Sequence, residues 1–355
     1  MTDQDDTPHL QSTVREAWRK GTPLRLIGSG SKNFYGRAIR TGEVLELSGH
    51  RGIVNYQPTE LVITARGGTP LEEIEETLNA QGQMLPFEPP HFNSGGTLGG
   101  AIASGLSGPR RPWGGSPRDL LLGVKLLDGK GRILRFGGQV MKNVAGYDIS
   151  RLMAGALGTL GVLLEVSVKV LPRPQEETGI RFTAKPQTAV SVLTRMLNQG
   201  VPITATYQSG EENALRLACS SERVRTILAR YRITPGDPLP DTFWFALRDH
   251  GHPFFTQNAP LWRLAVPPTA RLDFDEPVLS EWAGGQRWLY SHKPDDEIRQ
   301  QAEQQGGHAT RFRGGDRTAE VFHPLHPRIA DLQQGLKRVF DPKGILNPGR
   351  LYTED

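Results

Sequence analysis

Residues 93–105 constrain the fold of this chain more than any other segment. Five of these thirteen residues are glycine and nearly all the others are small. Because glycine has no Cβ atom, such a segment lets the backbone lie directly against a flat partner. The same composition also fits a mobile loop between folded elements, and the segment alone does not decide between the two interpretations.

A second glycine-rich segment, at residues 28–33, follows an expected strand at 22–27. Its alternating glycine and hydroxyl residues can turn successive backbone N–H groups toward one anion, and Lys32 adds charge. The segment lacks the Gly-x-x-x-x-Gly-Lys-Ser/Thr pattern of the P-loop, and Asn33 stands where the dinucleotide fingerprint would have its third glycine. It therefore predicts either a phosphate-binding turn of another kind or a plain glycine turn between strands.

The composition is that of a globular protein with a local excess of glycine. The 355 residues are enough for two or three core-forming units. Of the 41 glycines, 26 fall between positions 28 and 161, which points to a glycine-dependent site in the first half. The net charge of +4 comes from scattered arginines rather than from a basic block, so no nucleic-acid partner is expected.

Cysteine usage and hydropathy exclude several further classes. Cys219 is the only cysteine, and we expect it in the core. A single thiol excludes an internal disulfide and an iron–sulfur cluster held by this chain alone, because such clusters need about four thiolates. No window of about 18 apolar residues predicts a transmembrane segment. The first twenty residues carry three aspartates and no apolar run, which predicts neither a secretory signal nor a transit peptide.

The hydrophobic pattern predicts a mixture of helices and strands. Thr69 and Glu72 predict a capping box at the start of a helix that ends at Gly82. Strict alternation of apolar residues over 162–170 predicts a strand with one buried face, and Pro172 and Pro174 mark the domain boundary after it. Further strands are expected at 61–65, 180–184, 203–208, 214–219, 261–266 and 287–291, and helices at 188–199, 221–231, 294–305 and 329–340, whereas 248–260 has no clear pattern.

Five segments, in the same order along the chain, resemble successive motifs of the vanillyl-alcohol oxidase type (PCMH-type) FAD-binding proteins. They read GSGSK at 28–32, GTLGG at 96–100, KNVAGYD at 142–148, GTLGV at 158–162 and FDPKGILNPGR at 340–350. The resemblance covers the first 172 residues and the tail. Within that family the length and the motifs are most similar to the FAD-binding subunits of bacterial glycolate oxidase, also called glycolate dehydrogenase.

The resemblance implies an α+β fold with a two-lobed PCMH-type FAD-binding domain at 1–172. An α+β cap domain for substrate or partner would follow at 173–335, and a C-terminal strap at 336–355 would return to the FAD domain. Tyr147 and Asp148 border the flavin in the family's motif, although a packed tyrosine and a helix-start aspartate explain them equally well. The cofactor-binding residues implied by the motifs are Gly28, Ser29, Gly30, Ser31, Lys32, Asn33, Gly96, Thr97, Leu98, Gly99, Gly100, Ala101, Ser104, Gly105, Gly108, Gly158, Thr159, Gly161 and Val162.

Two differences from the family's sequences limit which of the family's properties apply to this chain. Several relatives bind flavin covalently through a histidine, but residues 28–33 and 93–116 contain none, so the resemblance implies noncovalent FAD. The catalytic glycolate and lactate subunits carry His-x-Gly-Asp-Gly-Asn-x-His in their cap, and this chain lacks that motif, so no catalytic residue is assigned. His323 and His326 are each followed by a proline, which predicts a rigid turn. His250 and His252 are expected in loops, so no metal site is predicted.

By this resemblance the chain is an FAD-binding redox subunit that takes part in oxidising glycolate, a small 2-hydroxy acid, to glyoxylate. Its partners would be a sister flavoprotein and an iron–sulfur subunit that receives the electrons. The expected location is the cytoplasm or the cytoplasmic face of the inner membrane, reached through the complex. Two alternatives stay open: a non-catalytic assembly subunit of the same complex, and a stand-alone FAD-dependent 2-hydroxy-acid dehydrogenase.

Overall fold

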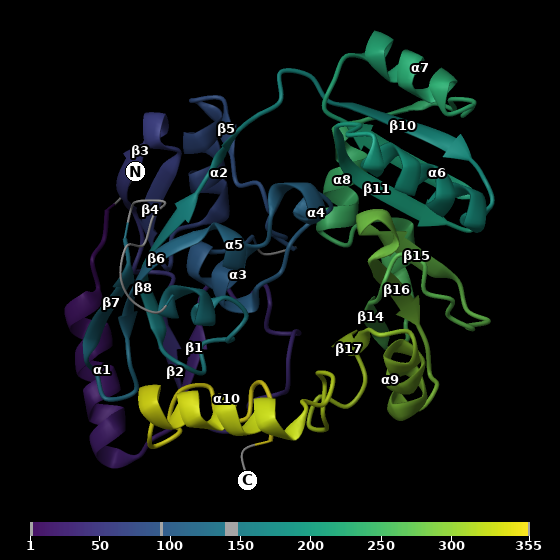
Figure 1. Ribbon diagram of the computed structural model, residues 1–355. Coiled ribbons are helices and arrows are strands. Elements are labelled where there is room, and N and C mark those ends of the chain that lie inside the picture. The colour runs from purple at the N-terminus through teal and green to yellow at the C-terminus, as the bar shows by residue number, and fades with distance from the viewer. Residues whose placement is uncertain (1–2, 93–94, 139–147, 354–355) are drawn as a thin grey trace. The chain divides into compact units, whose positions relative to one another are not determined.

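The computed structural model describes residues 3–92, 95–138 and 148–353, and its contacts divide the chain into two compact units (Figure 1). Unit 1 comprises Met1–Ser107, Gly115–Pro172 and Arg317–Asp355, and unit 2 comprises Gly108–Gly114 and Arg173–Asp316. The chain therefore returns to unit 1 at Arg317, while the domain limits 1–172, 173–335 and 336–355 stay a prediction.

The centre of unit 1 is an antiparallel five-stranded sheet in the order β3-β4-β8-β6-β7. Its strands are β3 (Ile53–Gln57), β4 (Val62–Arg66), β6 (Leu121–Leu127), β7 (Ile133–Gly137) and β8 (Val162–Lys169). Helices α2 (Leu71–Asn79) and α3 (Leu98–Ser104) share a hydrophobic core with β4, β6 and β8. Leu71, Ile74 and Leu78, spaced along one helical face, are completely buried in that core.

The start of α2 differs from the expected capping box. The helix begins with Pro70 at its N-cap and without a side-chain cap. Thr69 Oγ1 instead accepts a hydrogen bond from the backbone N–H of Gly52 at 2.9 Å and donates one to the Gly52 carbonyl at 3.2 Å. The capping prediction was wrong because a residue distant in sequence uses the same hydroxyl group.

Strand β8 also differs from its predicted alternation. A register shift falls between the pairs Lys125–Glu165 and Leu126–Leu163. As a result Leu163 packs in the same core as Val166, whereas Val162 and Leu164 pack in a second core on α1 (Thr7–Lys20). The prediction of one buried face was wrong because the irregularity exchanges the faces and both are covered.

The second core of unit 1 joins the two ends of the chain. It contains α1, the parallel pair β1 (Leu24–Ile27) and β2 (Glu43–Glu46), and Ile345 and Leu346 from the tail. Leu24 forms an isolated parallel bridge with Leu346. The tail thus crosses unit 1 next to its first strand.

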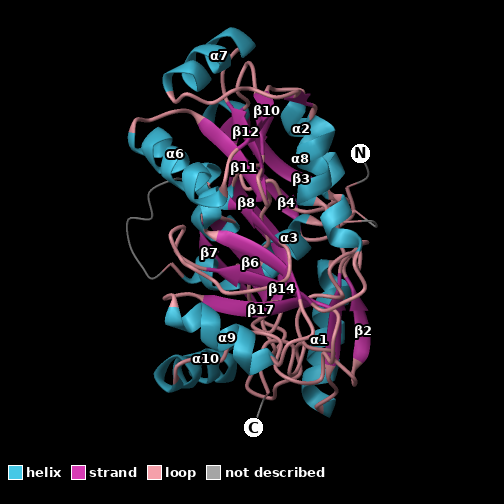
Figure 2. Cartoon of the chain, turned by 90° about the vertical axis from the view of Figure 1, so that its right-hand side faces the viewer, coloured by secondary structure: helices cyan, strands magenta, loops and turns pink. Residues whose placement is uncertain are grey.

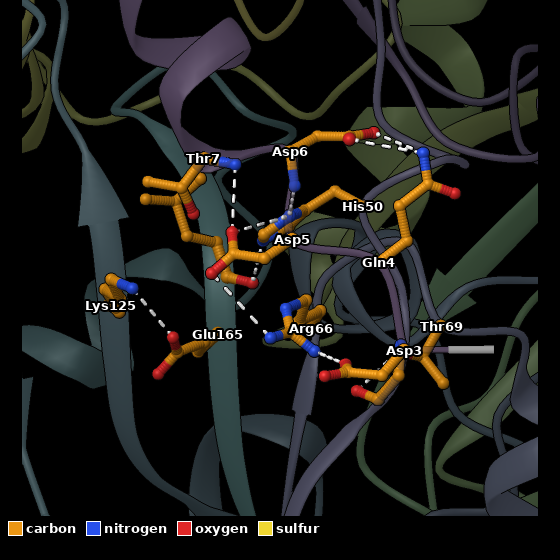
Figure 3. A network of polar contacts seen from close by, with 12 residues as sticks. Asp3, Gln4, Asp5, Asp6, Thr7, His50, Arg66, Thr69, Lys125 and Glu165 are labelled. Carbon is orange, nitrogen blue, oxygen red and sulfur yellow. Dashed lines mark hydrogen bonds and ion pairs between the residues drawn. The ribbon is translucent and has the colours of Figure 1, made fainter. Parts of the chain in front are cut away.

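A polar network holds the segment before α1 against the sheet (Figure 3). Arg66 forms an ion pair with Asp3 and lies 3.7 Å from Asp5. The backbone N–H of Asp6 donates to His50 Nδ1 at 3.1 Å, and His50 Nε2 lies 3.0 Å from the Leu164 carbonyl oxygen. These two bonds assign the proton of a neutral His50 to Nε2.

Unit 2 is built on an eight-stranded sheet in the order β13-β10-β12-β11-β15-β16-β14-β17. Helices α6 and α7 pack on β10 to β12, and α9 packs on β14, β16 and β17 (Figure 2). Cys219 is buried in the first of these cores, as expected. The strands are β10 (Thr178–Thr183), β11 (Ile203–Ser209), β12 (Glu212–Leu217), β13 (Pro238–Leu239), β14 (Leu261–Ala265), β15 (Val278–Glu281), β16 (Gln286–Tyr290) and β17 (His308–Arg313), and the three helices are α6 (Pro186–Asn198), α7 (Ser221–Arg230) and α9 (Asp295–Gln304).

The α+β class is confirmed, and the unassigned stretch near 248–260 contains the end of a helix and a short 3₁₀ turn. None of the helices in the described part of the chain is long and apolar enough to cross a bilayer. The remaining elements are η1 (Pro58–Glu60), β5 (Gln83–Met84), α4 (Arg111–Gly114), α5 (Pro117–Leu120), η2 (Ile149–Met153), β9 (Leu171–Pro172), α8 (Asp241–Arg248), η3 (Pro253–Thr256), η4 (Trp282–Gly284) and α10 (Pro327–Phe340).

Candidate functional site

A cavity of about 290 Å³ opens in unit 1 where β1 ends. The glycine-rich loop that follows β1 forms one side of it, and β1, α3 and the C-terminal part of the chain contribute most of the rest. Its lining residues are Arg25, Leu26, Ile27, Gly28, Ser29, Gly30, Ser31, Lys32, Asn33, Ala38, Ile39, Thr97, Gly100, Ala103, Ser104, Leu157, Arg317, Asn347 and Arg350.

The cavity is strongly cationic. Arg25, Lys32, Arg317 and Arg350 line it, and none of its described lining residues is an aspartate or glutamate. Burial, followed by the neighbouring charges of Arg317 and Arg25, lowers the pKa of Arg350 to about 10. Burial also lowers the pKa of Arg317. This crowding of like charge is relieved by an anion, so the cavity fits a phosphate group.

The loop 28–33 owes its shape to glycine at two positions. Gly30 has φ +76°, in the left-handed region that glycine adopts without strain. A Cβ atom on Gly28 would lie 2.7 Å from Thr97 Oγ1, so a larger residue would displace the first turn of α3. Ser29 Oγ donates to the Gly95 carbonyl at 3.1 Å, which ties the loop to the segment before α3.

Two arginines from the C-terminal part of the chain bind carbonyl groups of this loop and of the residues after it. Arg317 donates to the carbonyls of Asn33 at 2.7 Å and Gly36 at 2.9 Å. Arg350 donates to the carbonyls of Arg37 at 2.9 Å and Asn33 at 3.2 Å. We call this arrangement the carbonyl clamp. It neutralises the partial negative charges of these carbonyls beside a site that suits an anion.

The glycines of the run 93–105 serve different purposes. Gly100 lines the cavity, and an added Cβ would lie 3.1 Å from Thr97 Oγ1. Gly99 is small for another reason, because its Cβ would lie 2.7 Å from the Gly67 carbonyl oxygen where α3 passes the end of β4. A Cβ on Gly96 would meet Leu71 at 2.7 Å and Lys32 Nζ at 2.9 Å. Close packing within the chain therefore explains Gly96 and Gly99.

The structure brings nine of the implied cofactor-binding residues to the cavity. They are Gly28, Ser29, Gly30, Ser31, Lys32, Asn33, Thr97, Gly100 and Ser104. The other ten do not line it, and Gly108 belongs to unit 2. They are Gly96, Leu98, Gly99, Ala101, Gly105, Gly108, Gly158, Thr159, Gly161 and Val162. Asn93, Ser94 and Tyr147 lie outside the described residues.

Several lining residues carried no individual signal in the sequence. Arg25 belongs to an ordinary strand, and Arg317 lies in a stretch without any motif. Asn347 and Arg350 belong to the tail motif, which could have pointed to them. Asn347 Nδ2 donates to the Leu157 carbonyl at 2.7 Å, so the tail also fixes the opposite wall of the cavity.

Comparison with known proteins gives this cavity a context. The family model described as an FAD binding domain matches residues 5–137, which include the glycine loop and α3. "Glycolate oxidase subunit GlcE" of Escherichia coli (strain K12) is 46% identical over 351 residues, which cover 99% of this chain and 98% of that protein. The chain belongs to the family of this glycolate oxidase subunit. It is thus a member of the FAD-dependent oxidoreductases and carries an FAD binding domain.

Other known proteins resemble parts of the chain or its fold alone. "Glycolate oxidase subunit GlcD" of Bacillus subtilis (strain 168) is 32% identical over 154 residues, 43% of this chain and 33% of that protein. A solved structure of p-cresol methylhydroxylase with substrate bound has a TM-score of 0.71 at 15% identity and covers 97% of this chain and 87% of that chain. An alkyldihydroxyacetonephosphate synthase has a TM-score of 0.68 at 15% identity, covering 96% and 75%. These two structures support the fold.

The residues that line the cavity fit the diphosphate group of FAD. Four cationic side chains and a glycine loop whose shape depends on Gly30 are the features that a buried diphosphate needs.

In the part of the chain that the structure describes, no group of three His, Cys, Asp or Glu residues could hold a metal. His326 Nδ1 accepts the backbone N–H of Arg328 at 3.3 Å, and His252 Nδ1 accepts that of Phe254 at 3.3 Å, so both cap local turns.

Proposed function

We propose that this chain is the FAD-binding redox subunit of a glycolate dehydrogenase (glycolate oxidase) complex. In that complex glycolate is oxidised to glyoxylate, and the electrons pass to a partner iron–sulfur subunit. The bound flavin would supply the two-electron redox chemistry. The single observation that carries the proposal is the cationic cavity at the glycine loop, which lies in the matched FAD binding domain of a chain that is 46% identical to a glycolate oxidase subunit.

The residues of unit 1 would bind and orient FAD. Lys32, Arg317 and Arg350 would neutralise the diphosphate, and the hydroxyls of Ser29 and Ser31 would donate hydrogen bonds to it. The implied residues away from the cavity, such as Gly158 and Val162, would contact other parts of the cofactor through backbone. None of the described lining residues is histidine, which supports noncovalent binding.

The remaining subunits would supply what this chain lacks. Its single cysteine cannot hold an iron–sulfur cluster, so that cluster belongs to another subunit. A sister flavoprotein would be the third member, and the complex would work in the cytoplasm or at the cytoplasmic face of the inner membrane. Unit 2 would be the substrate or partner cap of the two-lobed FAD domain, and the tail would be its strap.

A second candidate is a non-catalytic assembly subunit of the same complex. The absence of the His-x-Gly-Asp-Gly-Asn-x-His motif favours it, because the sequence then lacks the usual proton-accepting groups of a 2-hydroxy-acid site. A stand-alone FAD-dependent 2-hydroxy-acid dehydrogenase is the third. One experiment on the purified chain distinguishes these three candidate functions.

The full chain should be purified alone and its visible spectrum recorded before and after anaerobic addition of glycolate or D-lactate. Flavin that stays oxidised until the sister flavoprotein is added supports the proposed relay of electrons. Flavin that bleaches with glycolate alone makes this chain itself the dehydrogenase. A colourless chain that binds no added FAD contradicts the proposal and leaves the assembly role. Acid precipitation should release the flavin into the supernatant if binding is noncovalent.

A further inference from the structure

The inner face of α10 is fixed by contacts within unit 1. Lys337 Nζ donates to the Thr159 carbonyl at 3.1 Å, to the Asp341 carboxylate at 2.8 Å and to the Leu346 carbonyl at 2.8 Å. The buried Phe340 ring packs edge-to-face on Phe136, with centroids 6.1 Å apart. Rotation of the helix would break these contacts, so the sides of α10 that do not carry Leu336, Lys337 and Phe340 stay on the outside of the unit (Figure 1).

One of these exposed sides, which we call the outer face, carries Leu332 and Val339 and is apolar. The side chains of Ile329, Leu332 and Val339 are 50%, 66% and 64% exposed. Three of the eight large exposed hydrophobic residues found in the described chain therefore lie on one helix. Leu332 and Val339 are seven positions apart, which places them two turns apart on the same side. Single exposed apolar residues need no explanation, but such a row on one helix is typical of an interaction surface.

A glycine lies in the middle of this outer face. Gly335 follows Leu332 by three positions and precedes Val339 by four, so the three residues share one side of the helix. Glycine inside a helix is unfavourable relative to alanine. An added Cβ on Gly335 would meet none of the described atoms within 4 Å. Packing within the described chain does not require this glycine, whereas close approach by a second backbone would.

We infer that the outer face of α10, defined by Leu332, Gly335 and Val339, docks a helix of another subunit of the glycolate oxidase complex. The inference rests on the proposed function. The exposed charges beside the face are Arg328, Arg338 and Asp331, with a positive balance. The partner helix therefore presents apolar side chains to Leu332 and Val339, passes closest at Gly335, and carries carboxylates at its rim.

The first test uses the three subunits co-expressed and purified through a tag on this chain. Leu332→Asp and Val339→Asp should each weaken assembly by about thirtyfold or more, the effect of losing one central apolar contact. Gln334→Asp, an exposed position on the other side of α10, is the matched control and should assemble like the wild type. Flavin content and unfolding temperature of each isolated variant show whether unit 1 is intact.

Assembly of Leu332→Asp and Val339→Asp at wild-type strength would overturn the inference while leaving the proposed function standing. A wild-type chain that does not bind the other subunits would overturn the proposed function, and the docking inference with it. Self-association of the wild type that Leu332→Asp abolishes would assign the face to a second copy, which also contradicts the inference.

A labelling experiment tests whether the outer face of α10 is covered in the complex, without a charged substitution that would weaken assembly. Cys219 is buried and is the only cysteine, so a Cys219→Ser background allows a single reporter thiol at Leu332→Cys or Gln334→Cys. In the free chain both thiols should react with Ellman's reagent. In the assembled complex the rate at position 332 should fall by about tenfold or more, as for a residue in an interface core, while position 334 keeps its rate. Equal rates at position 332 in both states would contradict the inference.

Discussion

The side-chain oxygen of Asn347 accepts a hydrogen bond from the backbone N–H of Leu26 at 2.8 Å, across 321 positions of sequence. Leu26 belongs to β1, which leads directly into the glycine loop, and Asn347 belongs to the tail. The same side chain reaches the Leu157 carbonyl on the other wall of the cavity. One buried amide therefore joins three segments that enclose the candidate FAD site.

Replacement of Asn347 by alanine should lower both stability and FAD content. It leaves the Leu26 N–H and the Leu157 carbonyl without this partner, which should cost about 2 kcal/mol or more of the free energy of unfolding of unit 1. Denaturant unfolding of the purified chain measures the loss. Asn79→Ala, at an exposed position at the end of α2, should change neither quantity. An unchanged midpoint for Asn347→Ala would show that the amide is dispensable.

Replacement of Gly30 by valine should remove FAD while leaving unit 2 folded. The new Cβ lies 3.3 Å from the Asn33 side-chain nitrogen, and the left-handed φ of +76° costs a non-glycine residue about 1–2 kcal/mol. Gly82→Val is the matched control, because Gly82 has φ +63° and open space around its Cβ, outside the cavity. Both variants carry backbone strain, but only Gly30→Val should lose flavin absorbance. A yellow Gly30→Val protein would refute the cofactor assignment.

Breaking the carbonyl clamp should weaken FAD binding. Arg350→Gln removes a charge from the cavity and its hydrogen bonds to Asn33 and Arg37. A hydrogen bond from the Arg350 guanidinium to the diphosphate of FAD should contribute about 1.5–3 kcal/mol to binding. Its loss should therefore raise the dissociation constant for FAD by about 10- to 100-fold. Flavin fluorescence titration at two salt concentrations measures this, and the salt dependence should shrink with the lost charge. Arg19→Gln, an exposed position on α1, should bind FAD like the wild type.

His50 should make unit 1 less stable in mild acid. Burial, the largest cause, lowers its pKa below the ordinary 6.5, although the Leu164 carbonyl, Asp5 and Asp6 oppose the shift and Lys125 adds to it. As the pH falls, His50 in the unfolded chain therefore takes up its proton at a higher pH than His50 in the folded chain. The stability contributed by neutral His50 is complete above pH 6.5 and declines as the pH falls from 6.5 toward the lower pKa of the folded state.

Unfolding temperatures at pH 7.5 and pH 5.5 test this pH dependence. His50→Gln should narrow the difference between the two values, because it removes the group whose protonation breaks the bond from the Asp6 N–H. His9→Gln, at an exposed position on α1, should leave the difference as it is in the wild type. A His50→Gln protein with the wild-type difference would exclude His50 as the source.

Local chemistry made much of the site predictable from the sequence. The loop 28–33 was identifiable because glycine and hydroxyl residues alternate after a strand, and the structure places all six residues at one cavity. The helix predicted at 221–231 is α7 (Ser221–Arg230), and the Ser220 hydroxyl before it accepts the backbone N–H of Arg223 at 3.4 Å. Both features depend only on neighbours in sequence.

Features that depend on distant parts of the chain were missed. Arg25 and Arg317 carry no local pattern, and they matter only because the fold places them beside Arg350. The predicted capping box failed because Gly52 takes the hydroxyl of Thr69. Gly99 stays a predicted cofactor contact, but the sequence did not show that its lack of a side chain also makes room for the backbone of Gly67. Tertiary contacts decide such cases.

The clamp between Arg350 and the carbonyl of Arg37 also bears on how this protein is made. The glycine loop is synthesised early, but the arginines that donate to its Asn33 carbonyl and the Asn347 amide come from the C-terminal part of the chain. The cavity is therefore complete only after Arg350 has left the ribosome, so we expect flavin to bind after translation. A premature stop between Lys169, where the last strand of the unit 1 sheet ends, and Arg350 would yield a chain with all five strands of that sheet but no finished cofactor site.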